Sequence, residues 1–156
     1  MKKSIFLAAL VLISAGCFAQ KANVSKARSL ADAETPDYAG ARDAIAEALQ
    51  NDETKDKADT WYVAGLIGYK EFSNGNLKQQ LGQQFDRKAW GDAVYESLKY
   101  WTKAYELAKI PTIDKKGKEK FDTRTPKSIV PKVVEYFNSM PLIIAGFDAY
   151  QAGDPS

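Results

Sequence analysis

The chain has 156 residues, of which 45% are hydrophobic and 27% are charged, and its formal charge at neutral pH is only +2. This balance gives no global electrostatic reason to bind nucleic acid or an anionic surface. The sequence has no histidine and a single cysteine, Cys17, so it excludes a Ser-His-Asp relay, a His-ligated zinc site and a disulfide within the chain.

The first residues have the features of a secretory signal peptide. Two lysines precede an apolar run over residues 5–15, and small residues precede a candidate cleavage site after Ala19. The apolar run is too short to span a bilayer as a stable anchor. We therefore expect residues 1–19 to be removed and residues 20–156 to form a single domain that is periplasmic or secreted.

A second interpretation uses the same segment. Ser14-Ala15-Gly16-Cys17 resembles a bacterial lipoprotein box, in which Cys17 would carry the acyl chains. The sequence departs from that pattern at Ser14, where lipoproteins prefer leucine. A membrane-anchored lipoprotein is the alternative localisation, and contact with a membrane is expected only if Cys17 is acylated.

The remaining sequence shows the apolar spacing of helices and no useful strand-like alternation. A first helix is predicted over residues 21–33, because Pro36 disfavours helix in the residue before it. Asp37 is a candidate N-cap for a second helix that ends at Leu49. These two helices should form a hairpin.

A third helix is predicted from Lys55 onward, with Trp61 and Phe72 on one face. Gly65 and Gly68 lie inside it, and two glycines weaken a helix unless a neighbouring backbone approaches too closely for a methyl group. The polar residues 73–76 are expected to end this helix.

Asp86 is a candidate N-cap for the strongest amphipathic pattern, which runs to Lys109 and ends before Pro111. The lysine-rich residues 112–125 are expected to be a solvated loop, with contact to acidic protein, lipid headgroups or lipopolysaccharide as the alternative. A final helix should begin near Thr125, whose hydroxyl is the candidate cap, and Pro141 should kink or split it.

An internal repeat links two of these helices. The segment Val63–Lys70 returns as Ile144–Gln151, with glycine and tyrosine in the same frame. Self-similarity of this kind is typical of repeat proteins.

At these residues the chain resembles the tetratricopeptide family, whose unit of about 34 residues has a first helix patterned Trp-x2-Leu-Gly-x2-Tyr and a second patterned Ala-x3-Phe-x2-Ala. The aromatic that ends the first pattern lies one residue late in both copies. The positions that carry the resemblance are Trp61, Ala64, Gly65 and Tyr69; Leu142, Ala145, Gly146 and Tyr150; Ala41, Ile45 and Ala48; and Ser97, Trp101 and Ala104.

The resemblance implies an all-α fold of irregular helical hairpins, stacked as a short right-handed solenoid with inserted stretches near 73–88 and 112–125. It implies a protein-binding or peptide-binding scaffold of the cell envelope, without catalysis, cofactor or metal. The chain could be the N-terminal part of a longer repeat protein. The apolar residues of its last helix also predict self-association.

Aromatic residues outside the apolar stripes are the candidates for ligand contact. Tyr62, Tyr95 and Tyr100 are expected to be exposed, where they would anchor a partner protein or, as the alternative function, a carbohydrate or envelope glycan. A glycosidase would need a pair of carboxylates. Glu96, Glu106 and Glu135 are the candidates, but each has the sequence context of a solvated charge.

Overall fold

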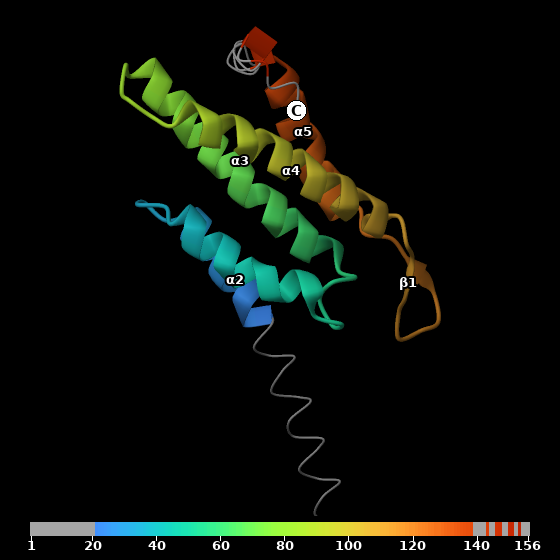
Figure 1. The fold of residues 1–156 in the computed structure, drawn as a ribbon. Coiled ribbons are helices and arrows are strands. Elements are labelled where there is room, and N and C mark those ends of the chain that lie inside the picture. The colour runs from blue at the N-terminus through green and yellow to red at the C-terminus, as the bar shows by residue number, and fades with distance from the viewer. Residues whose placement is uncertain (1–20, 139–142, 144–145, 148–149, 152, 154–156) are drawn as a thin grey trace, which may run out of the picture.

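The computed structural model describes residues 21–138, 143, 146, 147, 150, 151 and 153, and these are mostly helical (Figure 1). The predicted all-α class is therefore confirmed in its helix content. The predicted signal segment, Cys17, Leu142 and Ala145 lie outside the described residues. The elements are a helix over residues 21–31, α2 (Tyr38–Gln50), α3 (Ala58–Gln80), α4 (Arg87–Ala108), β1 (Thr112–Ile113), β2 (Glu119–Lys120) and α5 (Arg124–Asn138).

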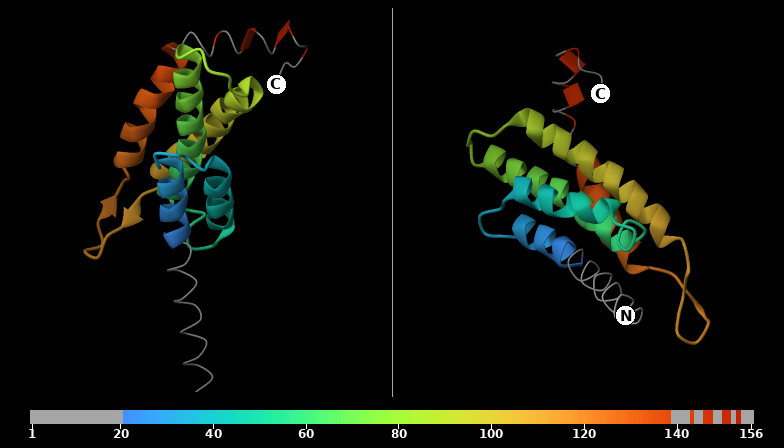
Figure 2. Two further views of the ribbon diagram at one scale, coloured as in Figure 1. Left: turned by 90° about the vertical axis from the view of Figure 1, so that its left-hand side faces the viewer. Right: turned by 60° about the horizontal axis from the view of Figure 1, so that its bottom comes forward.

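Helix α3 is the centre of the arrangement. It contacts α2, α4 and α5, and the views of Figure 2 place α2 and α5 on different sides of it. Every residue from Val63 to Gly68 is buried, as expected of a helix that is apolar on all sides. The helices before and after α3 therefore share it as a common packing surface.

Two hydrophobic clusters of different character meet at α3. The first joins residues 21–31, α2 and one side of α3 through small side chains such as Ala27, Ala31 and Ala41, which let the helices approach closely. The second joins α3, α4 and α5 through large rings. Its aromatic members include Phe72, Trp90, Trp101 and Tyr136.

The two predicted aspartate caps are confirmed. Asp37 accepts a hydrogen bond from the backbone N–H of Gly40 at 2.8 Å, and Asp86 accepts one from Ala89 at 3.0 Å. Helices α2 and α4 therefore begin where these local sequence signals predict.

The predicted end of the third helix at residues 73–76 is wrong, because α3 continues to Gln80. Gly75 leaves space for the Trp90 indole, whose Cδ1 would lie 2.5 Å from an added Cβ. Packing thus outweighs the low helix propensity of this segment. Gly82, at φ 67°, then ends the helix, and the N–H of Gln83 donates to the carbonyl of Lys78 as in a Schellman motif.

The expected loop over residues 112–125 is also corrected, since it contains a short antiparallel hairpin in which Thr112 pairs with Lys120 and Ile113 pairs with Glu119. Helix α5 begins at Arg124, where the Asp122 side chain accepts hydrogen bonds from the N–H groups of Arg124 and Thr125. The capping group is therefore Asp122 rather than the predicted Thr125 hydroxyl. The expected break at Pro141 lies outside the described residues.

Candidate functional site

The three tyrosines predicted to face solvent do not form a common exposed platform. Tyr62 is half-buried, stacks on Trp101 with ring centroids 6.4 Å apart, and has the Arg28 guanidinium 5.6 Å from its ring centre. Tyr100 is also half-buried and packs against Trp61. The expectation of exposure is therefore wrong for these two.

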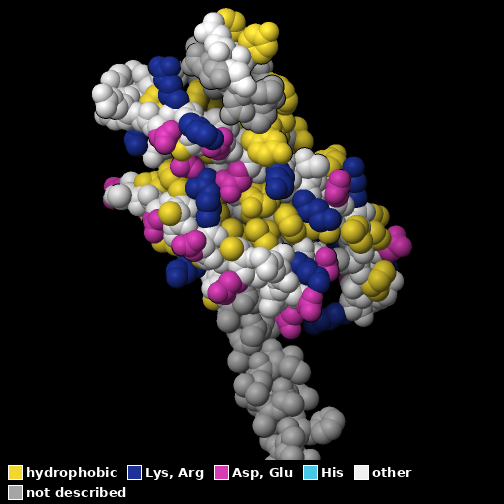
Figure 3. Space-filling model, viewed as in Figure 1, with side chains coloured by type: hydrophobic (Ala, Val, Ile, Leu, Met, Phe, Trp, Pro, Cys, Tyr) yellow, Lys and Arg dark blue, Asp and Glu magenta, His cyan; other side chains and the backbone are white. Residues whose placement is uncertain are grey.

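Tyr95 on α4 is 70% exposed, so the prediction of exposure is confirmed for this tyrosine. Apolar side chains do reach the surface across the middle of the face shown in Figure 3, interrupted by charges of both signs. Most of the ring surface that the sequence offered as a stacking platform is nevertheless used for internal packing.

The positions that carry the repeat pattern in residues 41–104 all lie inside the helical packing. Gly65 faces Trp101 so closely that a methyl group would overlap the indole, so the close neighbour here is a side chain and not the predicted backbone. At Gly68 the predicted backbone approach is confirmed, because a methyl group would overlap the carbonyl of Ala93. At Gly146, where the repeat also suggests close helix contact, no described atom lies within 4 Å of the place of an added Cβ. The buried or half-buried pattern residues are Ala41, Ile45, Ala48, Trp61, Ala64, Gly65, Tyr69, Ser97, Trp101 and Ala104.

Three helices are joined by an ionic cluster that sequence reasoning did not find. Arg42 on α2 binds both oxygens of Glu96 on α4, with its Nε at 3.1 and 2.9 Å, and its Nη2 lies 2.6 Å from Glu71 on α3. Partial burial tends to lower the pKa of the Arg42 guanidinium, but the hydrogen bonds that it donates to both carboxylates outweigh burial and raise this pKa. Long-range pairing of this kind leaves no local sequence signal.

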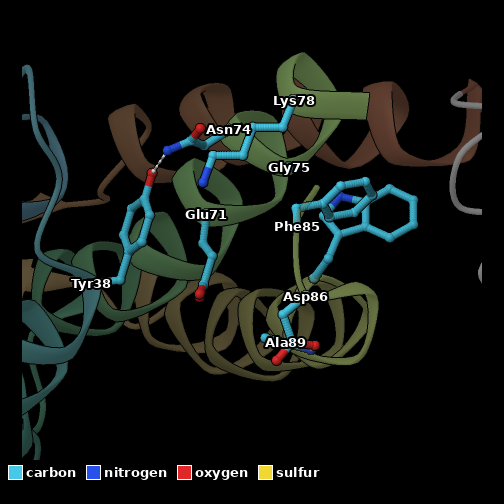
Figure 4. Close-up of a pocket in the computed structure, with 9 residues that line it drawn as sticks. Tyr38, Glu71, Asn74, Gly75, Lys78, Phe85, Asp86 and Ala89 are labelled. Atoms are coloured by element: carbon cyan, nitrogen blue, oxygen red, sulfur yellow. Dashed lines mark hydrogen bonds between the residues drawn. The ribbon is translucent and has the colours of Figure 1, made fainter. Parts of the chain in front are cut away.

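A hollow of about 170 Å³ opens beside this cluster, between the start of α2, the second half of α3 and the start of α4 (Figure 4). The Tyr38 phenol points toward Asn74, whose amide donates to it at 3.3 Å. Phe85 and Trp90 form the aromatic side of the hollow. The walls could receive a small polar group or a single side chain of a partner.

The two carboxylates at this hollow already have structural roles. Glu71 is paired with Arg42, and Asp86 caps α4. Of the other carboxylates considered for catalysis, Glu96 binds Arg42 and Glu135 accepts from the Tyr69 hydroxyl at 2.5 Å. In these contacts each carboxylate is engaged by a side chain of another helix rather than by a second acid, whereas a glycosidase needs a pair of carboxylates.

Tyr69 lies at the contact between α3 and α5, and its surroundings change its ionisation. Burial, followed by the hydrogen bond to Glu135, raises the pKa of the Tyr69 phenol to about 12. The Lys132 ammonium lies 5.5 Å from the centre of the same ring. These contacts join Glu135 and Lys132 of α5 to Tyr69 of α3.

The clearest binding feature is a second apolar row on α5. Ile129, Val133 and Tyr136 pack inward, but Val130, Val134 and Phe137 are 52, 51 and 70% exposed. Their spacing of four and three residues places these three side chains on one side of the helix, beside the inward row. We call them the exposed α5 row. Sequence reasoning overlooked Val130 and Val134, although their helical spacing is present in the sequence.

Exposed apolar side chains continue beyond α5. Ile143, Phe147 and Tyr150 have the same spacing and are 61, 61 and 78% exposed. The prediction that the end of the chain leaves apolar surface exposed is confirmed at these described positions. No helix within the described residues is long and apolar enough to cross a membrane, and these residues contain no cluster of acidic side chains suited to a metal ion.

No protein-family model matches the chain, no curated protein matches it, and no solved structure matches it. Its function is therefore argued from its own surfaces.

Proposed function

We propose that this chain is a non-enzymatic protein-binding module of the bacterial cell envelope, built of irregular tetratricopeptide-like hairpins stacked as a short right-handed solenoid. The observation that carries the proposal is the exposed α5 row, because contiguous apolar surface on a folded domain marks a site of interaction. Export is supported by the signal-like residues 1–19.

The occupant of the exposed α5 row is an amphipathic helix of a partner protein. The chain covers a helix in this way elsewhere: α4 packs along α3 with side chains such as Trp90, Val94 and Trp101. Val130, Val134 and Phe137 span two turns of α5. Helix-in-groove interfaces use apolar contacts at this spacing to bind a short helix.

Charge at one end of the row gives the partner helix a direction. Lys127 is exposed and lies one turn before Val130, on the same side of α5. An acidic side chain at the facing end of the partner helix would pair with Lys127 and suppress the reverse orientation. The carbohydrate alternative has weaker support, because Tyr62 and Tyr100 are half-buried.

The experiment places a photo-crosslinking amino acid at position 137 or, as the matched control, at the equally exposed position 95. Each variant chain is expressed in cells of the organism that makes this protein, and the cells are then irradiated. A discrete adduct with another protein should form from position 137, should disappear in the Val134→Asp chain, and should persist in a Lys99→Asp chain, whose changed residue lies on exposed α4 surface.

Two results would refute the proposal. Adducts that are equal from positions 137 and 95, or unchanged by Val134→Asp, would mean that the exposed α5 row is not a docking face. An adduct of two copies of this chain would make a second copy the occupant instead of a different protein.

A further inference from the structure

The lysine-rich segment is an ordered projection rather than a loose linker. The Asp114 side chain accepts hydrogen bonds from the N–H groups of Lys116 at 2.7 Å and Lys118 at 3.0 Å, and Gly117 takes a left-handed conformation at φ 74°. The backbone N–H of Asp114 also donates to the carbonyl of Lys118. Figures 1 and 2 show this hairpin extending away from the helices.

One face of the hairpin carries its two large apolar side chains. Successive residues of a strand point to opposite sides, and Ile113 pairs with Glu119, so Ile113, Glu119 and Phe121 share one face while Thr112 and Lys120 share the other. Ile113 is 66% exposed and Phe121 is 51% exposed. Ile110, at the base of the hairpin, is 60% exposed. Every residue from 110 to 121 is open to solvent, so these apolar side chains have no cover among the described residues.

The charge of the hairpin is biased toward the positive. Residues 109–121 contain five lysines and two acidic residues, and one of the latter, Asp114, is occupied by the backbone of the turn. Lys115, Lys116 and Lys118 lie in the turn between β1 and β2, in the hairpin that extends away from the helices. The chain as a whole is nearly neutral, so this positive charge is local.

We propose that this hairpin docks on an anionic lipid surface, with the lysines at the headgroup phosphates and with Ile113 and Phe121 entering the interface. A small convex projection offers too little area for a stable protein interface, which buries 1,200 Å² or more in typical complexes. A bilayer needs no shaped partner surface, and it rewards exposed apolar side chains and basic charges together. The inference does not depend on the exposed α5 row.

The test is cosedimentation of the purified chain with phosphatidylcholine vesicles that either contain or lack phosphatidylglycerol. Three hairpin lysines close to the surface should together strengthen binding on the order of a hundredfold, so the Lys115→Gln, Lys116→Gln, Lys118→Gln variant should lose binding to the anionic vesicles. The Ile113→Ser, Phe121→Ser variant should bind roughly tenfold more weakly than the unchanged chain.

The matched controls change exposed residues of the same kinds elsewhere. Lys99→Gln, Lys103→Gln and, separately, Leu81→Ser should leave vesicle binding unchanged, and circular dichroism should show that all variants remain helical. Any binding due to residues 1–20 is present in every variant and is removed by comparison.

The proposal is overturned if binding does not depend on phosphatidylglycerol, or if Ile113→Ser, Phe121→Ser binds as tightly as the unchanged chain. If soluble polyglutamate instead binds the chain in a lysine-dependent way and more tightly than the vesicles do, the hairpin is a site for an acidic polypeptide and the lipid proposal is wrong.

Discussion

The described residues of the two copies of the repeated segment have opposite environments. In the first copy Gly65 faces the Trp101 indole and Leu66 is 5% exposed, whereas in the second copy Gly146 has no described atom within 4 Å of an added Cβ and Phe147 is 61% exposed. Similar sequences therefore do not produce similar packing. The difference lies in α4, which lies against the first copy, while no described residue of the chain lies against Gly146.

This contrast shows what a glycine in a helix can and cannot predict. Gly65, Gly68 and Gly75 form the side of α3 on which α4 lies, and at Gly68 an added methyl group would overlap the backbone carbonyl of Ala93. The glycines permit close contact, but contact occurs only where a partner helix is present. The second copy has the permissive residue, Gly146, and no described helix lies against it.

The largest expected effect on stability comes from adding a side chain at the buried glycine of the first copy. Gly65→Leu should destabilise the chain by about 3 kcal/mol or more, since Trp101 is 1% exposed and cannot move aside. Gly146→Leu should change the free energy of unfolding by less than about 0.5 kcal/mol, because it adds a side chain to open surface. Urea denaturation measures both. Equal losses would mean that the second copy is also covered.

A smaller loss of stability is expected at the ionic cluster beside the first copy, in which Arg42 pairs with Glu71 and Glu96. Arg42→Met should cost about 2 kcal/mol, because it leaves Glu71 and Glu96 half-buried without their shared cation. Arg28→Met, at a more exposed pair with Asp59, should cost less than about 0.5 kcal/mol. Adding Glu71→Gln and Glu96→Gln to Arg42→Met should recover part of the loss, and failure to do so would assign the effect of Arg42 to packing alone.

A third prediction concerns Tyr69, the tyrosine of the first copy. Its folded pKa of about 12 lies above the ordinary value of 10, so the folded state resists deprotonation of this phenol. Stability from this site is therefore full below about pH 10 and is lost as pH rises from about 10 to about 12. Tyr69→Phe should flatten this part of the pH profile of unfolding. An unchanged profile would assign alkaline unfolding to other groups, such as the buried Tyr136.

Sequence signals placed the elements that depend on neighbouring residues. Asp37 and Asp86 marked helix starts because a capping side chain reaches only its own first turn. The same local reasoning predicted too early an end for α3. Gly75 packs against the Trp90 indole of α4, and a local sequence pattern does not reveal a contact between two helices.

The predictions for the candidate site residues also failed where residues that are distant in the sequence meet. Tyr95 was correctly predicted to be exposed, but Tyr62 and Tyr100 pack against tryptophans on other helices. Arg42 joins Glu71 and Glu96 only after three helices have assembled. The exposed α5 row was visible in the sequence as helical spacing, and what the structure adds is which of the two apolar rows on α5 faces inward.

The most direct test of the central claim is the stability of Phe137→Ala in the isolated chain. If the exposed α5 row awaits a partner, removing this 70% exposed ring should change the free energy of unfolding by less than about 0.5 kcal/mol. Tyr136→Phe, at the adjacent buried position, should cost about 1 kcal/mol through loss of its 2.7 Å hydrogen bond with Ser97. A loss of about 3 kcal/mol or more for Phe137→Ala, as for a phenylalanine in a core, would show that the chain covers this face itself and would contradict the claim.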